Sequence, residues 1–198
     1  MVITISRQVG AGGTVLGKKI ADALGYDYYD KKILELASAK TGISEEVFER
    51  AEKEHNSFLY SLATANYAGY SASLFNIEMN TSDNLFAIQS NIIKEIAQKG
   101  NCVIVGRCAN QVLDEEKDVL KVFLHADKDF RVANVAEQNN IILKDAEALV
   151  KKLDKKRAAY YNFFTSGTWG DASDFDISIN TSKISFSKAA DLIINCVK

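Results

Sequence analysis

Residues 2–25 read VITISRQVGAGGTVLGKKIADALG, and this segment carries the strongest indication of how the chain folds. A short β-branched apolar run is followed by a glycine cluster, and then by apolar residues at helical spacing up to Gly25. The order predicts a strand, a loop and a helix, with the loop built around Gly10, Gly12 and Gly13.

The same alternation of strand and helix continues along the chain. After the first strand, one predicted strand ends at Asp30, and three more span 102–106, 120–126 and 175–180. Predicted helices include one from Ser82 to a stop at Gly100 and one at 187–197. This pattern indicates an α/β fold, in which a parallel sheet is covered by helices on both faces and binds ligands at the carboxyl ends of its strands.

The length and the charge of the chain limit the classes of function that are possible. The chain has 198 residues, with 24 lysines and arginines against 26 acidic residues and a net charge of −2. This is the size of a single domain, 1–198, and the balanced charge argues against binding of a nucleic acid polymer, which needs a cationic surface. The balanced charge does not argue against binding of a compact anionic ligand.

The cysteines and the apolar runs indicate a compartment. Cys102, Cys108 and Cys196 show no metal-ligand or disulfide spacing, which favours a reducing environment. The opening apolar run is too short for a signal peptide, and the sequence has no apolar run of the length that a membrane span needs. We therefore expect a cytoplasmic protein that does not bind a membrane.

The loop RQVGAGGT, residues 7–14, partly matches the phosphate-binding pattern G-x-x-x-x-G-K-[ST]. Gly12 and Thr14 match, but Arg7 stands at the first glycine position and Gly13 at the lysine position. Consecutive small residues still allow backbone N–H groups to converge on an anion at a helix N-terminus. The alternative is a tight turn that binds nothing. The expected donor-phosphate cradle comprises Gly10, Ala11, Gly12, Gly13 and Thr14.

The missing lysine removes a cation that phosphoryl transfer normally uses to stabilise developing charge. We expect Arg7 to take its place. The alternatives are that Lys18 or arginines of a later helical segment supply the charge, or that transfer is slow or absent.

Arginines are scarce in this lysine-rich chain, and four of the five lie at places where a planar, bidentate group would suit phosphate. Arg107 follows a predicted strand, and Arg131 and Arg157 lie in two predicted helices, whereas Arg50 lies in an acidic helix and is expected to face solvent. The alternatives are an exposed strand end for Arg107 and surface ion pairs with nearby aspartates for the other two. Asp30 is expected to bind a sugar hydroxyl or a base amine, or else to cap the helix after it.

Two regions depart from the simple alternation. Residues 127–167 predict two helices joined near 139–144, a hairpin suited to act as a lid over a ligand. Residues 44–81 begin as a helix and continue as a polar and aromatic segment, in which the stretch 58–75 is a candidate interface for a homodimer.

Several blocks of the sequence together resemble the cytidylate-kinase-like proteins, a branch of the P-loop nucleoside monophosphate kinases. The blocks are ITISRQVGAGGTVLGKKIADALG at 3–25, YYDKKIL at 28–34, VIVGRCANQVL at 103–113, LDKKRAAYYNFFTSGTWGD at 153–171 and FDISINTS at 175–182. The resemblance implies a P-loop kinase-type three-layer fold with a five-stranded parallel sheet. It also implies a helical acceptor-binding insertion at 31–81 and a helical lid at 127–167.

The resemblance also implies roles for single residues. Arg107 resembles the arginine that grips the acceptor's phosphate, and Asp30 falls near the acceptor-binding acidic residue. Arg131 and Arg157 resemble lid arginines that close over the donor and transferring phosphates. The chain departs from the family pattern at three positions: Gly13 replaces the loop lysine, Cys108 replaces an aspartate, and Asn134 stands where a second lid arginine often lies.

Residues and resemblance together predict a kinase that transfers the γ-phosphoryl group of ATP, with Mg²⁺, to a nucleoside monophosphate of the CMP type or to a related small acceptor. We expect the Thr14 hydroxyl to ligate Mg²⁺, and Arg7, Arg131 and Arg157 to act on the transferring group. One alternative is a nucleotide-binding sensor or regulatory module that transfers nothing, and another is a kinase of a non-nucleotide metabolite.

Overall fold

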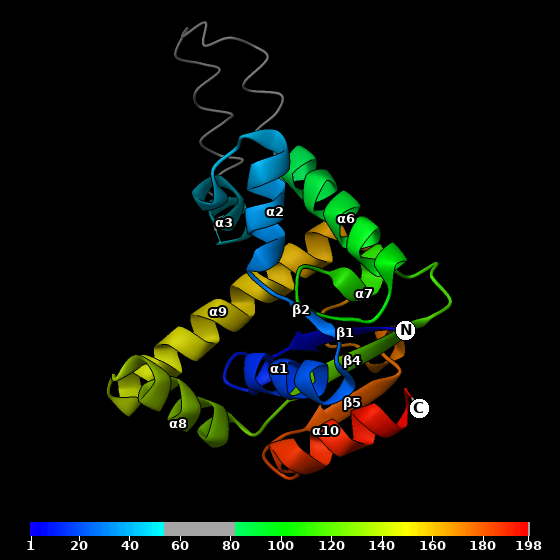
Figure 1. The fold of residues 1–198 in the computed structure, drawn as a ribbon. Helices are drawn as coiled ribbons and strands as arrows, with labels where there is room; N and C mark the ends of the chain where they lie inside the picture. Colours follow the sequence, from blue (N-terminus) through cyan, green and yellow to red (C-terminus); the bar gives the residue numbers. More distant parts are fainter. Residues whose placement is uncertain (54–81, 198) are drawn as a thin grey trace, which may run out of the picture.

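A computed structural model describes residues 1–53 and 82–197. Its centre is a five-stranded sheet in the order β2-β3-β1-β4-β5, in which every neighbouring pair is parallel (Figure 1). The strands are β1 (Val2–Arg7), β2 (Asp27–Tyr29), β3 (Cys102–Val105), β4 (Val119–His125) and β5 (Ile177–Asn180). The predicted parallel sheet is confirmed. Residues 54–81, which include the aromatic stretch 58–75 and the second half of the predicted insertion, lie outside the described residues.

The central strand β1 is buried on both faces, which explains why its first four residues are all β-branched and three of them are apolar. Ile3 and Ile5 pack into the core on one face, and Val2 packs into the core on the other. In the register of the sheet, Ile5 lies beside Val105 of β3 and Val122 of β4. Successive side chains of a strand point to opposite faces, so both faces of β1 need an apolar cover.

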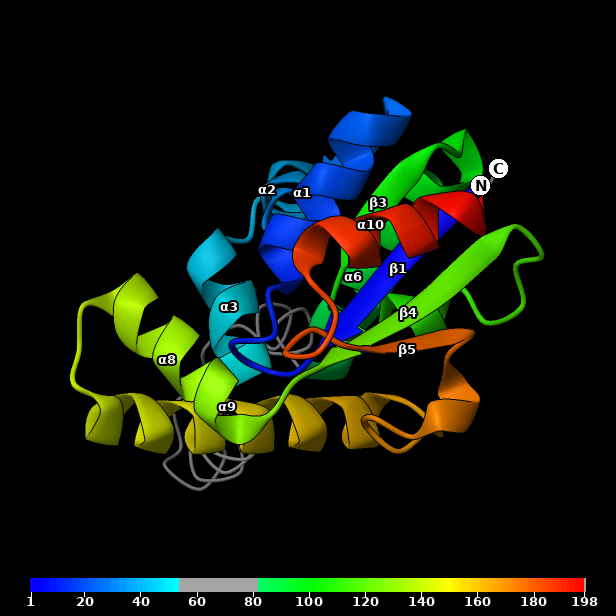
Figure 2. The ribbon, with the colours of Figure 1, turned by 90° about the horizontal axis from the view of Figure 1, so that it is seen from below.

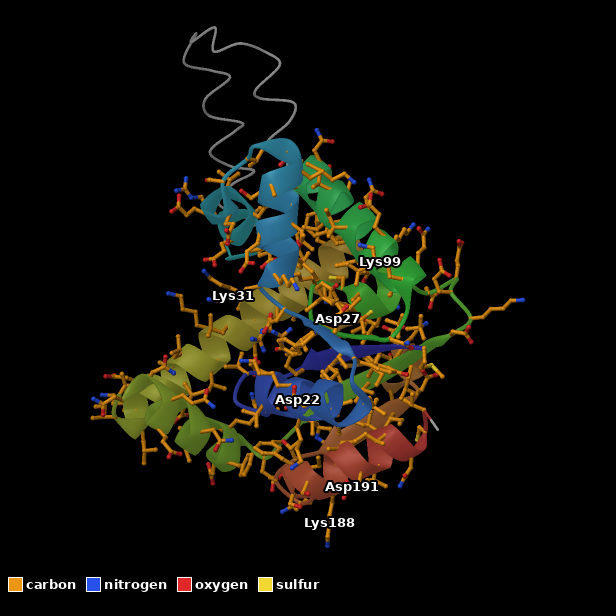
Figure 3. All side chains as sticks on the ribbon, viewed as in Figure 1. Asp22, Asp27, Lys31, Lys99, Lys188 and Asp191 are labelled. Carbon is orange, nitrogen blue, oxygen red and sulfur yellow. The ribbon has the colours of Figure 1, made fainter. Side chains whose placement is uncertain are left out.

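Helices supply that cover on both faces. One face carries α1 (Gly13–Leu24) and α10 (Phe186–Asn195), and the other carries α2 (Lys32–Thr41), α3 (Glu45–Lys53), α6 (Ser82–Lys99) and the short α7 (Ala109–Val112) (Figures 1 and 2). Exposed charged side chains, including Asp22, Lys99, Lys188 and Asp191, lie on the outer surfaces of these helices (Figure 3). The three-layer arrangement therefore follows from amphipathic helices on a buried sheet.

A helical hairpin lies beyond the carboxyl ends of β1 and β4 (Figure 2). It consists of α8 (Lys128–Asn139) and the long helix α9 (Leu143–Phe164). Its own small core includes Val132, Val150 and also Val9 from the glycine loop. The hairpin is thereby packed against the loop. A 3₁₀ turn (Ala172–Asp174) precedes β5. Among the described residues, no helix is long and apolar enough to cross a membrane.

Candidate active site

The glycine loop between β1 and α1 adopts a backbone that only glycine tolerates at two positions. Gly10 and Gly12 have φ angles of 80° and 83°. A Cβ atom at Gly10 would lie 2.4 Å from the backbone oxygen of Arg131, and one at Gly12 would lie 2.3 Å from Cζ of Phe186. Both the left-handed backbone and the lack of space exclude a side chain there.

The loop presents backbone N–H groups at the start of α1. Gly12 is the N-cap residue and has no side chain to cap the helix, and the first intrahelical bond is donated by Leu16 to the Gly12 oxygen at 2.9 Å. The N–H groups of Gly13, Thr14 and Val15 therefore have no acceptor within the helix. Together with the positive end of the helix dipole, these N–H groups are arranged as in sites that can bind an anion.

Two side-chain hydroxyl groups and one carboxylate lie beside this site. The Thr14 hydroxyl donates to a carboxylate oxygen of Asp30 at 3.4 Å, and the Tyr28 hydroxyl donates to the same oxygen at 3.3 Å. The N-cap residue of α2 is Lys31, whose side chain makes no capping hydrogen bond. Within the described residues, no group of three or more acidic, histidine or cysteine side chains forms a metal site. One hydroxyl and one carboxylate suit Mg²⁺, which keeps several waters and binds substrate phosphates.

Arg7 passes over the position where the phosphate-loop pattern has lysine. A Cβ atom at Gly13 would lie 2.8 Å from Cγ of Arg7, and one at Gly106 would lie 1.9 Å from its Nη1 atom. The arginine side chain thus needs glycine at both positions. Its guanidinium lies 3.9 Å from the Asp30 carboxylate. The alternative cation, Lys18, instead lies over the Tyr28 ring.

Arg157 of α9 lies next to Arg7, and its guanidinium donates to the Arg7 backbone oxygen at 3.1 Å. Burial lowers the pKa of Arg7, and burial together with the charge of Arg7 lowers the pKa of Arg157 to about 9. A guanidinium group carries a positive charge at neutral pH. Two cations that are poorly solvated and repel each other favour a bound anion between them.

Arg107 is held by an unusual turn at the end of β3. Gly106, Arg107 and Cys108 have successive φ angles of 83°, 58° and 56°. Left-handed backbone is costly for the two residues with side chains, and such strain is typical of functional sites. The Arg107 guanidinium donates through Nε to the Asp30 backbone oxygen at 3.1 Å, and through Nη1 to the Glu52 carboxylate.

Arg131 of α8 braces the glycine loop. Its guanidinium donates to the backbone oxygens of Ala126 and Val9, at 3.1 and 3.2 Å, and pairs with Asp154. Asn134 adds a bond to the Gly10 oxygen at 2.9 Å. The guanidinium would have to leave these acceptors to reach a phosphate directly. The predicted ion pair with an aspartate is present for Arg131.

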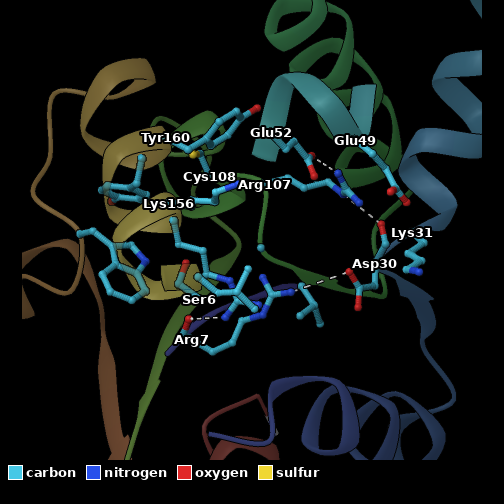
Figure 4. Close-up of a pocket in the computed structure, with 16 residues that line it drawn as sticks. Ser6, Arg7, Asp30, Lys31, Glu49, Glu52, Arg107, Cys108, Lys156 and Tyr160 are labelled. Atoms are coloured by element: carbon cyan, nitrogen blue, oxygen red, sulfur yellow. Dashed lines mark hydrogen bonds and ion pairs between the residues drawn. The ribbon is translucent and has the colours of Figure 1, made fainter. Parts of the chain in front are cut away.

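A pocket of about 380 Å³ lies beside the loop (Figure 4). Three of the four predicted phosphate-binding arginines line it, and Arg131 does not. Five cationic side chains outnumber three acidic ones, so the pocket favours an anion. Its walls also include apolar and aromatic groups. The charged residues are Arg7, Lys31, Arg107, Lys156, Arg157, Asp30, Glu49 and Glu52, and the aromatic residues are Tyr160, Tyr161 and Trp169.

Sequence reasoning missed Glu52, Lys156 and Trp169 as members of the pocket. Tyr160 follows Arg157 by three residues and therefore shares its helix face, a spacing that indicates a common site. Glu52 gave no such signal, because it lies in an acidic helix that reads as a solvent-facing surface.

The chain belongs to the cytidylate kinase-like family, whose sequence model matches residues 2–183. A cytidylate kinase of Pyrococcus horikoshii is 28% identical over 185 residues, which cover 92% of this chain and 81% of that protein. A cytidylate kinase of Staphylothermus marinus is 27% identical over 199 residues, which cover 98% and 94%. The predicted family is confirmed.

Solved structures agree with this placement. An uncharacterized protein of Eubacterium ventriosum is 26% identical and superposes with a TM-score of 0.74, with 100% of this chain and 98% of that chain covered. A shikimate kinase of Acinetobacter baumannii, solved with shikimate, is 16% identical with a TM-score of 0.55, covers 99% and 92%, and shows a shared fold alone. Family and fold together make the chain a phosphotransferase of the nucleoside monophosphate kinase-like kind, with the P-loop kinase-type fold that the sequence predicts.

Proposed function

We propose that the protein transfers the γ-phosphoryl group of ATP, with Mg²⁺, to a nucleoside monophosphate of the CMP type. The observation that carries this proposal is the contact between Arg7 and Arg157, two partly buried arginines that line the pocket, with the Arg7 side chain also beside Gly13 at the start of α1. An anionic group that passes from the loop to the pocket would cross this pair. Fixed cations at that point stabilise charge that develops during transfer.

On the donor side, the amides of residues 10–14 would hold the donor phosphates. The Thr14 hydroxyl would ligate Mg²⁺, which when bound neutralises phosphate charge. Arg7 would supply the cation that the loop lysine supplies elsewhere, because its side chain occupies the space over Gly13.

On the acceptor side, Arg107 would bind the acceptor's phosphate, and Asp30 would bind a polar group of the acceptor. The pocket volume of about 380 Å³ is within the range for small-molecule sites, and the Trp169 and Tyr160 rings offer apolar surface for a base. A phosphate oxygen is already negatively charged at neutral pH, so the acceptor needs no base to activate it.

Arg157 would bind the transferring group from the lid helix α9 and help to exclude water. Arg131 would contribute from α8, either directly or by fixing the backbone oxygens of the loop. Catalysis would consist mainly of positioning and charge stabilisation.

A coupled kinase assay with ATP and Mg²⁺ against CMP, UMP, AMP and shikimate, beside calorimetric binding of ATP, tests this function. We expect turnover with a nucleoside monophosphate, and fastest with CMP. Tight ATP binding without turnover for any acceptor would contradict the proposal and favour a regulatory nucleotide-binding module. Turnover with shikimate or another non-nucleotide acceptor alone would favour a metabolite kinase.

A further inference from the structure

The contact between Glu52 and Arg107 is the most unusual feature of the acceptor pocket. Arg107 is the cation at the end of β3 that the strained turn directs into the pocket, and its side chain is only 8% exposed. Its Nη1 atom pairs with the carboxylate of Glu52, which projects from α3 (Figure 4). The Glu52 carboxylate thus occupies the Arg107 guanidinium, which would otherwise be well placed to bind the anionic group of a ligand.

The two ends of the Arg107 guanidinium differ in how firmly they are held. Its Nε atom donates to the backbone oxygen of Asp30, an acceptor that cannot swing away. Its Nη1 atom contacts side chains only, the Glu52 carboxylate and, at 3.5 Å, the amide oxygen of Gln89. The Nη1 end can therefore exchange partners while the guanidinium keeps its position.

The Glu52 carboxylate is a partner that can be replaced. Both Glu52 and Arg107 line the pocket, so a ligand in the pocket reaches the contact between them. Burial raises the pKa of Glu52, although the charge of Arg107 opposes this effect. A carboxylate whose ionised form is poorly solvated competes weakly against a phosphate with a larger charge.

We propose that Glu52 is an intramolecular competitor of the acceptor, and that the acceptor's phosphate binds Arg107 by displacing the Glu52 carboxylate from it. This inference rests on the proposed function of the pocket as the acceptor site. Glu52 then sets the acceptor's affinity, because every anionic ligand must overcome the same internal ion pair. A ligand without an anionic group leaves the pair intact.

The variant Glu52→Gln tests the competition, since an amide keeps the size of the side chain but binds a guanidinium more weakly than a carboxylate does. We expect the variant to bind CMP and inorganic phosphate about tenfold more tightly than the wild-type protein, by the same factor for both ligands. Binding of cytidine, which lacks the phosphate, should not change. Trp169 is the only tryptophan in the chain and lines the pocket, so its fluorescence reports binding beside calorimetry.

Glu46→Gln is the matched control, because Glu46 is an exposed residue of the same helix and does not line the pocket. It should leave all three affinities unchanged. In the double variant Glu52→Gln/Arg107→Ala the gain in phosphate affinity should disappear.

Each other outcome for Glu52→Gln overturns the proposal. Weaker CMP binding by the variant would show that Glu52 binds the acceptor directly. Phosphate binding that is unchanged or absent in the variant would show that the ion pair with Arg107 has only a structural role. These are equilibrium measurements without ATP, so they are independent of turnover. A protein without kinase activity that still gains phosphate affinity would contradict the proposed function alone.

Discussion

The donor loop and the acceptor pocket meet at Arg7, but they are built in different ways. The proposed donor loop would bind through backbone N–H groups, and its shape depends on the left-handed glycines Gly10 and Gly12. The proposed acceptor pocket is instead lined by side chains of residues far apart in the chain, such as Arg107, Glu52 and Arg157. A backbone site is specified by a few adjacent residues, whereas a side-chain site depends on how distant elements pack. The first should tolerate few substitutions, and the second should be tunable.

Removal of the Arg157 charge should have the largest effect, because this side chain stands where the loop and the pocket meet. Arg157→Ala should lower kcat by about 10³-fold, the lower range for arginines that stabilise phosphoryl transfer, with little change in ATP affinity. Steady-state kinetics and calorimetry check this. Arg50→Ala, at an exposed arginine outside the pocket, is the control and should keep full activity. A kcat for Arg157→Ala within a few-fold of wild type would remove Arg157 from the mechanism.

Exchange of the cation tests whether Arg7 replaces the loop lysine. Gly13→Lys alone should lower kcat by about 10²-fold, because the new Cβ collides with the middle of the Arg7 side chain. Arg7→Ala alone should have a similar effect through the lost charge. The double variant Gly13→Lys/Arg7→Ala should be more active than either single variant. If the double variant is no more active than either single variant, a lysine at position 13 does not replace Arg7.

Glycine substitutions at the two ends of α1 separate strain from phosphate binding. Gly12→Ala should lower the free energy of unfolding by about 2 kcal/mol and abolish ATP binding, because of its φ of 83° and its contact with Phe186. Gly25→Ala is the control, since it has a φ of 67° with open space around the added Cβ, and should cost about 1 kcal/mol with unchanged ATP affinity. Urea unfolding and calorimetry measure both. Normal ATP affinity in Gly12→Ala would exclude the loop as the donor site.

The smallest expected effect is a pH dependence that belongs to Glu52. Because burial raises its pKa in the folded protein, protonated Glu52 stabilises the fold relative to the ionised form. That contribution is present below the ordinary glutamate pKa of 4.5 and is lost as the pH rises through the raised value. The free energy of unfolding of the wild-type protein, relative to Glu52→Gln, should therefore fall as the pH rises from 4 towards neutrality in urea titrations. A rise of this free energy difference with pH would contradict a raised pKa of Glu52.

The sequence predicted the structure of the glycine loop better than that of the pocket, for a physical reason. Strand, glycine loop and helix follow from adjacent residues, and the carboxyl-end rule for parallel sheets brought Arg7 and Arg107 to one edge. The turn at Arg107 to Cys108, with two left-handed residues that are not glycine, has no local signature. The partner of Arg107 also could not be predicted, since Glu52 reaches it only through the packing of α3 beside the pocket.

The choice of partner for Asp154 was likewise beyond local prediction. Asp154 lies one helical turn before Arg157 and could have paired with it. In the structure it pairs with Arg131 of the facing helix and accepts the Val9 N–H at 2.8 Å. Spacing within one helix could not decide between these partners, because the choice depends on how α8 and α9 pack.

A crystal structure with Mg²⁺ and a non-hydrolysable ATP analogue tests the central claim most directly, that the loop amides and the Arg7 and Arg157 pair hold the transferring phosphates. The account predicts that the terminal phosphate lies between the two guanidinium groups, with the other phosphates against the amides of residues 10–14. Phosphates bound away from residues 10–14, with neither arginine in contact, would contradict it.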